Sequence, residues 1–353
     1  MGRSRRRSRF VVAAPAGVRI RTRLHPTPDE ARVLTEIGEF NGRFYRRELA
    51  GRIALGNLDR KGQAEFRAAR KRALTAQTSS RWAGAITRSV QDQYQCGMRA
   101  LVAQAKDLDA AVAAVAARCA LAPGERNGRV TGYRDGAERF QKTRRLEILR
   151  DRAERVHHRW DSGRPSIVMG GKRWWRTRNH LTEGGLTEHR WRQQWNAARM
   201  FLTADGETGK SGGNETLRVI PGTGQLRIKV PAGLADRFGI HLAITTPVEF
   251  HHRGQQWRDR VQANRAVRYD ISYDPTRCRW YLDTSWTLEP TLQIPLTALR
   301  AGRVLGVDLN DGHLTTSLLD ASGTLGPNQS TCGREMTYRP FRRPAKLPGT
   351  QRM

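Results

Sequence analysis

Residues 304–314, VLGVDLNDGHL, place a carboxylate inside an apolar run of strand-forming residues. A buried carboxylate is unfavourable unless a cation or several hydrogen-bond donors meet it. Two interpretations of Asp308 follow. It can accept hydrogen bonds from turn amides together with Asn310 and Asp311. Alternatively, it can be a metal ligand, because a central strand that delivers one Asp is how some two-metal phosphodiester-cleaving sites begin.

The stretch GKRWWRTR at 171–178 interleaves cations with aromatic side chains. In such a pattern the cations can pair with phosphates while the rings stack on bases. The alternative is a pair of core tryptophans beside solvated cations. We predict nucleic-acid contacts for this stretch and for the first strand, at Lys172, Arg173, Trp174, Trp175, Arg176, Arg178, Arg19, Arg21 and Arg23.

Other motifs are weaker. ADGETGKS at 204–211 satisfies a relaxed phosphate-loop pattern with Ala204 in place of the first glycine. A true phosphate loop joins a buried strand to a helix, whereas here a strand is expected to follow, so a Gly-rich loop between strands is favoured. The histidine pairs 157–158 and 251–252 point their rings in different directions and favour surface or RNA contacts over a metal site. An ATP-dependent enzyme is therefore the least favoured function class.

Composition indicates a polyanionic partner. The 353-residue chain has 63 Lys and Arg against 33 Asp and Glu, a formal net charge of +30. Such an excess favours nucleic acid over a small-molecule substrate. We expect no membrane partner, since no apolar window approaches the ~18 residues of a membrane span. The basic N-terminal segment is too briefly apolar for a signal peptide. We expect a cytoplasmic, prokaryotic, nucleoid-associated protein; its oligomeric state is not predicted.

Cysteine spacing gives no sign of a metal or disulfide framework. The four cysteines stand far apart, and the sequence contains no CxxC pair. A zinc ribbon needs such pairs, and a disulfide framework belongs to shorter secreted chains. We therefore expect neither, with the cysteines at Cys96, Cys119, Cys278 and Cys332.

Hydrophobic periodicity divides the first half of the chain. A basic arm at 1–9 leads to a first strand in 10–25, where Val18, Ile20, Thr22 and Leu24 alternate with arginines. A basic helical block is expected at 26–160. Its helices begin at a Thr27 cap, near Ser79–Ser80 and near Asp135, the last of them running to Trp160.

Residues 161–295 are predicted to form mainly strands. At 166–169 SIVM predicts a short strand, followed by a Gly-Gly turn and a short helix carrying Trp191 and Trp195. Further strands are expected in 214–220, 224–230, 246–252, 266–274 and 279–288, which predict a small barrel or sandwich over 161–295.

The C-terminal part begins with a hairpin. Residues 303–309 and 313–323 are joined by the turn signal NDG. From 326 to 353 the apolar pattern fails and the composition is basic, which predicts a disordered tail.

These segments, in this order, resemble TnpB-like (OrfB-type) transposon-encoded RNA-guided endonucleases, relatives of the type V CRISPR effectors. The resemblance is carried by GGKRWWRTRNHL, WRQQWNAARM, GNETLRV, AVRYDISYDPTRCRWYLDTSW and RVLGVDLNDGHL, within residues 10–325. It implies an α+β multidomain protein: a wedge β-barrel formed by 10–25 and 161–295, interrupted by a helical recognition domain at 26–160, and a RuvC-like (ribonuclease-H-like) nuclease domain beginning at 301–325. Guide RNA and DNA are the implied partners.

The resemblance also implies that Asp308 is the first RuvC-like carboxylate and a Mg²⁺ ligand. The family needs further carboxylates downstream, and this chain offers only Asp311, Asp320 and Glu335. The resulting hypothesis is a transposable-element protein truncated early in its nuclease domain, with the tail at 326–353 read out of frame. It would be nuclease-defective but able to bind nucleic acid. The alternative is a binding-only nucleic-acid regulator.

Overall fold

The computed structural model describes residues 17–288, 298, 301–310, 313–320 and 330–332. It is a mixed α/β structure with several small antiparallel sheets. The chain divides into two compact units, of which the larger is Pro15–Leu288. The predicted basic arm at 1–9 lies outside the described residues.

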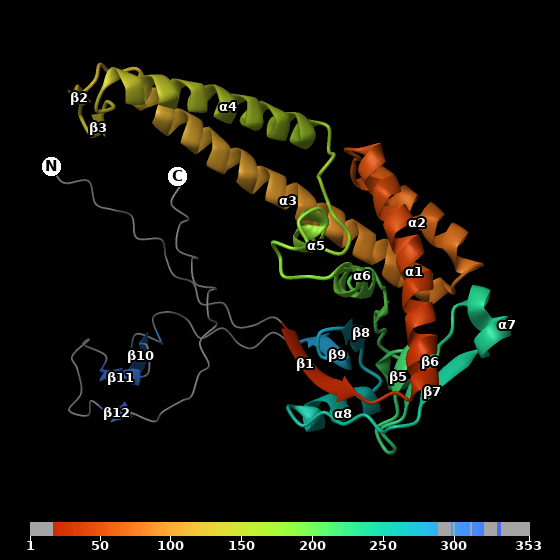
Figure 1. The fold of residues 1–353 in the computed structure, drawn as a ribbon. Helices are drawn as coiled ribbons and strands as arrows, with labels where there is room; N and C mark the ends of the chain where they lie inside the picture. Colours follow the sequence, from red (N-terminus) through yellow and green to blue (C-terminus); the bar gives the residue numbers. More distant parts are fainter. Residues whose placement is uncertain (1–16, 289–297, 299–300, 311–312, 321–329, 333–353) are drawn as a thin grey trace. The chain divides into compact units, whose positions relative to one another are not determined.

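Four helices occupy most of the segment between the first strand and residue 161 (Figure 1). They are α1 (Pro28–Leu55), α2 (Arg60–Thr75), α3 (Ser80–Cys119) and α4 (Gly136–Asp161). Three begin where the sequence predicts a helix start, and Thr27, Ser79 and Asp135 are their capping residues, of which Thr27 is the predicted cap. The Thr27 amide donates a 2.7 Å hydrogen bond to the Glu30 carboxylate, and the Glu30 amide donates one of 3.3 Å to the Thr27 hydroxyl. Helix α2 also begins at a capping residue, since the Asp59 carboxylate accepts a 2.7 Å hydrogen bond from the Gly62 amide, but only Leu74 of its residues is buried and no apolar stripe marks it.

Helices α3 and α4 lie side by side as a long hairpin (Figure 1). Leu101, Ala105 and Val156 are buried between them. The two helices are connected through the short ribbon β2 (Arg126–Asn127) and β3 (Val130–Thr131). Because this buried cluster is small, most of the side chains of α4 remain exposed to solvent.

The first sheet joins the two ends of the larger unit. Its order is β1-β9-β8-β4, and its strands are β1 (Gly17–Leu24), β9 (Arg279–Thr287), β8 (Arg268–Asp274) and β4 (Thr203–Ala204). The alternation predicted for the first strand is confirmed, since Val18, Ile20 and Leu24 are buried and the arginines between them are exposed. The helices are thus inserted between β1 and its partner β9, which gives the predicted order of strand, helical block and strands.

A second sheet has the order β5-β6-β7, with strands β5 (Leu217–Val219), β6 (Leu226–Lys229) and β7 (His241–Ile244). The short helices α7 (Ala235–Phe238) and α8 (Gly254–Gln262) lie before and after β7 in the sequence. Both sheets and α1 share one apolar core, which contains Trp82, Tyr269 and Leu282.

Two strand predictions in this region are wrong. Residues 246–252 form no strand, although Val248 and Phe250 are buried. Their alternation reflects two side chains that enter the core from an extended loop, where Val248 donates one backbone hydrogen bond to Gly224. Residues 166–169 also form no strand; Ile167 and Met169 instead pack against the helical cluster of α1 and α3.

The smaller unit contains a three-stranded antiparallel sheet of β10 (Val304–Asn310), β11 (His313–Leu319) and β12 (Ser330–Cys332). The predicted pairing of β10 with β11 is confirmed, and Asn310 is paired with His313 across the turn. Strand β12 falls inside the segment predicted to be a disordered tail and corrects that prediction for three residues. The remainder of that segment lies outside the described residues.

Candidate nucleic-acid interface

The predicted contact stretch forms a short helix, α5 (Lys172–Thr177), that packs on α6 (Glu188–Ala197). Trp191 donates a 2.8 Å hydrogen bond from its indole nitrogen to the Trp174 carbonyl. Its ring stacks on Trp195 with centroids 5.6 Å apart and planes 14° apart. Trp175 continues the series, 6.4 Å from Trp195 between centroids. Four of the protein's nine tryptophans thus gather on two adjacent short helices.

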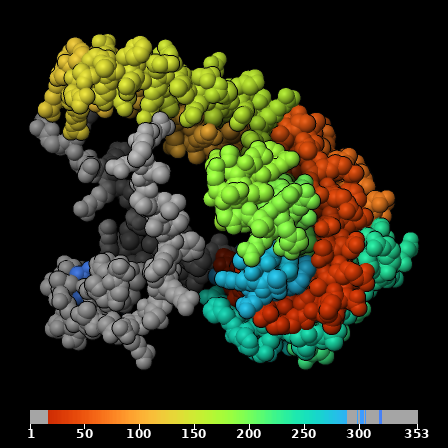
Figure 2. All heavy atoms as spheres, viewed as in Figure 1, coloured from red at the N-terminus to blue at the C-terminus, as the bar shows by residue number. Residues whose placement is uncertain are grey.

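These tryptophans do not form a core. The side chain of Trp175 is 51% exposed, and none of the α5 and α6 residues is buried. Figure 2 shows this region as light-green spheres at the surface, beside the red spheres of α1. The alternative of two core tryptophans beside solvated cations is therefore wrong for this stretch.

An arginine lies over each of three of these rings. Arg173 lies 4.9 Å from the Trp174 ring centroid, Arg178 lies 5.7 Å from that of Trp175, and Arg199 lies 4.8 Å from that of Trp195. Residues 170–200 contain seven Lys and Arg against two Glu. Among these cations, Arg192 alone is ion-paired within the described residues, with Glu188 at 2.6 Å. We call this set, residues 172–178 with Trp191, Trp195 and Arg199, the tryptophan–arginine surface.

Two consecutive glycines allow this surface to form. Gly170 and Gly171 have φ of +93° and +92°, a backbone conformation that residues with a Cβ rarely adopt. A Cβ on Gly170 would lie 3.0 Å from ring carbons of Trp195. The Gly-Gly turn therefore lets the chain pass directly beneath the indole before α5 begins.

The predicted contacts on the first strand have a different environment. Arg21 donates hydrogen bonds of 2.8 and 2.9 Å to the two carboxylate oxygens of Asp283, and Arg19 lies 3.2 Å from the same carboxylate. These two cations are thus paired with carboxylates of the sheet, Asp283 of β9 for both and Asp270 of β8 for Arg19. Arg23 is exposed and forms no ion pair with the described residues.

For Asp308 the structure gives only the backbone position. It lies in β10, paired with Thr315 of β11, and its side chain lies outside the description. No group of three or more His, Cys, Asp or Glu that could hold a metal ion occurs among the described residues. The described residues therefore offer no ligand set to match with Mg²⁺, and we assign no metal-dependent step.

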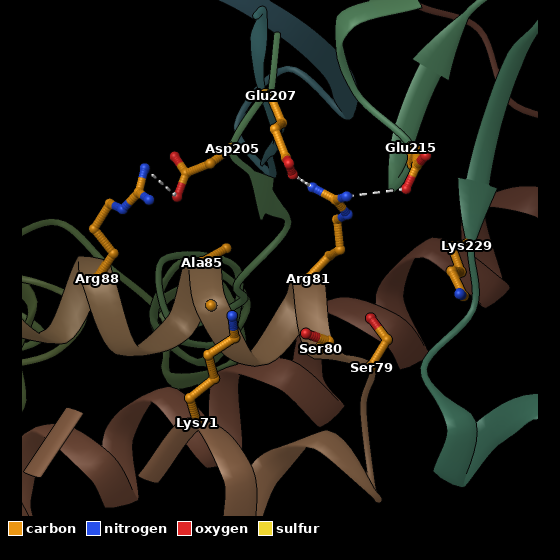
Figure 3. Close-up of a pocket in the computed structure, with 12 residues that line it drawn as sticks. Lys71, Ser79, Ser80, Arg81, Ala85, Arg88, Asp205, Glu207, Glu215 and Lys229 are labelled. Carbon is orange, nitrogen blue, oxygen red and sulfur yellow. Dashed lines mark hydrogen bonds and ion pairs between the residues drawn. The ribbon is translucent and has the colours of Figure 1, made fainter. Parts of the chain in front are cut away.

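A cleft of about 530 Å³ lies between the start of α3 and the loop at 204–211 (Figure 3). Its charges are largely paired within the cleft: Arg81 contacts both Glu207 and Glu215, and Arg88 lies 3.4 Å from Asp205. The loop leads into a three-residue 3₁₀ turn and then into β5, not into a helix. The predicted Gly-rich loop is confirmed, and a phosphate loop is not formed.

Sequence comparison finds no matching protein-family model and no matching curated protein. None of the helices in the described parts of the chain is both long and apolar enough to cross a membrane.

The sequence pattern does not single out all of the surface, nor Arg46 beside it. It gives no signal for Arg46 or Arg199, and it shows Trp191 and Trp195 only as neighbours on one helix. Their spacing, four residues apart, is the available signal for a shared face. Arg46 carries no such signal, because it reaches the surface from α1 through a contact with Arg199, 153 residues away in the sequence.

Proposed function

We propose that this chain is a nucleic-acid-binding protein and that the tryptophan–arginine surface is one of its contact sites. The observation that carries the proposal is the coincidence of one exposed and three half-buried indole rings with arginines that lack carboxylate partners among the described residues. Phosphates supply the missing negative charge, and bases supply flat partners for the rings. The net charge of +30 supports a polyanion as the partner of the whole chain.

The resemblance to TnpB-like proteins supplies a finer form of the proposal. In that form the partners are a guide RNA and its DNA target, α1 to α4 are recognition helices, and the two sheets of the larger unit belong to a wedge barrel. Strands β10 and β11 then open a RuvC-like domain with Asp308 as its first carboxylate. The 353-residue chain is expected to bind without cleaving, because one such carboxylate cannot hold two metal ions.

The test is binding of the full chain to fluorescein-labelled RNA and DNA, followed by anisotropy over a series of salt concentrations. We expect affinity to fall steeply with salt, since each phosphate contact releases counterions. Replacing Arg173, Arg176 and Arg178 with Gln should reduce the slope of log affinity against log salt by about 3.

A matched control removes the same charge elsewhere. Arg32, Arg155 and Arg237 are exposed and each contacts a carboxylate, so their replacement with Gln changes the net charge equally. An equal loss of affinity in both triple variants would contradict the assigned surface. Absence of salt-dependent binding would contradict nucleic-acid binding itself, and Mg²⁺-dependent cleavage lost in Asp308→Ala would overturn the binding-only expectation.

A further inference from the structure

Beside the tryptophan–arginine surface lies a mostly apolar cleft of about 360 Å³. One wall comes from α1, one from the extended segment 167–169, and one from α5 and α6. Its volume lies within the range of small-molecule sites, roughly 300–1,000 Å³. Its lining includes Arg46, Ile167, Met169, Trp175, Trp195 and Arg199.

The cleft is fixed by a close approach between α1 and the chain after α6. A Cβ on Gly42 would lie 2.3 Å from the Arg199 carbonyl oxygen, and one on Gly38 would lie 3.0 Å from Met200. One turn beyond Gly42, Arg46 donates a 3.1 Å hydrogen bond to the same Arg199 carbonyl. The glycines thus bring the two arginines to one edge of the cleft.

Neither of these arginines has a carboxylate partner among the described residues, and the cleft lining contains no acid. Burial lowers the pKa of Arg199. Burial also lowers the pKa of Arg46, and the positive charges of Arg199 and Arg43 lower it further, against a smaller opposing effect of Glu39. Two partly buried like charges therefore stand together, an arrangement that an anion would stabilise.

The aromatic wall complements this charge. Trp195 is already stacked on Trp191 on one side, whereas half of Trp175 remains exposed. An exposed indole in a cleft that is also lined by the aliphatic side chains of Ile167 and Met169 is suited to a flat ring. The cleft thus combines a ring-binding surface and an anion-binding edge among the residues that line it.

We propose that this cleft binds one unstacked nucleotide of a single-stranded segment, with its base against Trp175 and its phosphate at Arg46 and Arg199. The inference rests on the proposed nucleic-acid binding and deepens it. A duplex does not supply the ligand, because its bases are stacked and paired. RNA and DNA strands share the required chemistry.

The experiment compares four labelled probes on the full chain: 12-mers of rU and of dT, a dT 12-mer with abasic sites at its centre, and a 12-base-pair DNA duplex. We expect Trp175→Ala to weaken binding of the rU or dT strand about 10-fold. Binding of the abasic strand and of the duplex should change less than 2-fold, and Trp175→Phe should restore most of the affinity. Arg46→Gln should weaken the dT and abasic strands alike, because both retain phosphates.

Trp160→Ala is the matched control, since Trp160 is also a partly exposed tryptophan but lies at the end of α4. Thermal unfolding of each variant verifies that the fold is retained. Equal binding of abasic and intact strands, or unchanged affinity of Trp175→Ala, would overturn the nucleotide cleft while leaving salt-dependent binding in place. Competition by free UMP or TMP at micromolar concentration would also overturn it, by assigning the cleft to a mononucleotide. Loss of all salt-dependent binding would instead remove the proposed function.

Discussion

Arg21 stands directly opposite Asp283 in the ladder between β1 and β9, and its guanidinium holds both carboxylate oxygens at 2.8 and 2.9 Å. On the other side of β9, Asp283 is paired with a second carboxylate, Asp270 of β8. Arg19 lies 3.2 Å from Asp283 and 3.8 Å from Asp270, and Arg268 of β8 lies 3.4 Å from Asp270. Two acidic residues can therefore face each other in this sheet because Arg19, Arg21 and Arg268 surround them.

We expect this group to make the stability of the protein sensitive to acid. Burial acts to raise the pKa of Asp283, but the hydrogen bonds and charges of Arg21 and Arg19 outweigh it and lower the pKa below the usual value. A depressed pKa in the folded state contributes stability above the unfolded pKa of about 3.9 and loses it as pH falls through the folded pKa. Asp283→Asn should be about 2 kcal/mol less stable at pH 7. Its deficit should shrink below about pH 4 in urea unfolding followed by circular dichroism; a deficit that stays constant under acid would contradict the ion pair.

Arg21 and Arg176 should separate stability from binding. Arg21→Ala leaves the buried Asp283 with one arginine and should cost about 1 kcal/mol, a modest value because the Arg21 side chain is half exposed. Arg176 contacts no carboxylate among the described residues, so Arg176→Ala should change stability by less than about 0.5 kcal/mol. It should instead lower the salt slope of RNA binding by about 1. Thermal melts and anisotropy titrations of both variants check this. A loss of stability in Arg176→Ala, with a lower salt slope in Arg21→Ala, would contradict both assignments.

The elements that the sequence predicts well are those with strong local signals. The Thr27 cap is followed by Glu30 at the position that completes a capping box, and the first strand alternates its arginines with Val18, Ile20, Thr22 and Leu24. Helix α2 lacks an apolar stripe because it is exposed along most of its length. The extended loop at 246–252 has the pattern of a strand because two of its alternate side chains are buried.

The candidate site can be predicted from the sequence only where its residues are consecutive in the chain. The segment from Lys172 to Arg178 contains cations and aromatic rings within seven consecutive residues, so its pattern can be recognised in the sequence. The cleft depends instead on Gly42 approaching the Arg199 backbone, a contact between distant parts of the chain. A glycine within a helix has several possible causes, and no local pattern shows that its missing side chain makes room for another segment.

Substitutions at Gly170 and Gly171 should distinguish the cost of a steric clash from the cost of backbone strain. Both have φ near +90°, but only at Gly170 would a Cβ meet the Trp195 ring. Backbone strain should therefore lower the free energy of unfolding of Gly171→Ala by about 1–2 kcal/mol. In Gly170→Ala the clash with the ring should lower it by at least about 1 kcal/mol more. Near-ultraviolet circular dichroism should report disturbed tryptophan packing in Gly170→Ala only. Equal destabilisation of the two variants, with identical spectra, would show that the turn does not support the indole.

Asn214 and Asn41 are both fully buried, yet their environments differ. The Asn214 amide donates to the carbonyls of Ala204 and Val267 at 3.0 and 2.9 Å, and its oxygen accepts from the amides of Thr216 and Leu217 at 3.0 Å each. Its full hydrogen-bonding capacity is used to join the loop before β5 to the strands beside it. Both polar atoms of the Asn41 side chain, on α1, are without a hydrogen-bond partner in the described structure.

Substitution with alanine should therefore act in opposite directions at these two positions. Asn214→Ala leaves four buried backbone groups without their side-chain hydrogen-bond partner, and it should lower the free energy of unfolding by about 3 kcal/mol. Asn41→Ala removes an unsatisfied amide from a helix interior and should leave stability unchanged or raise it by about 0.5–1 kcal/mol. Urea unfolding of the two variants at neutral pH gives the comparison directly. A large loss of stability in Asn41→Ala would mean that the Asn41 amide is hydrogen-bonded in solution. A small loss of stability in Asn214→Ala would mean that water replaces the Asn214 amide in the loop.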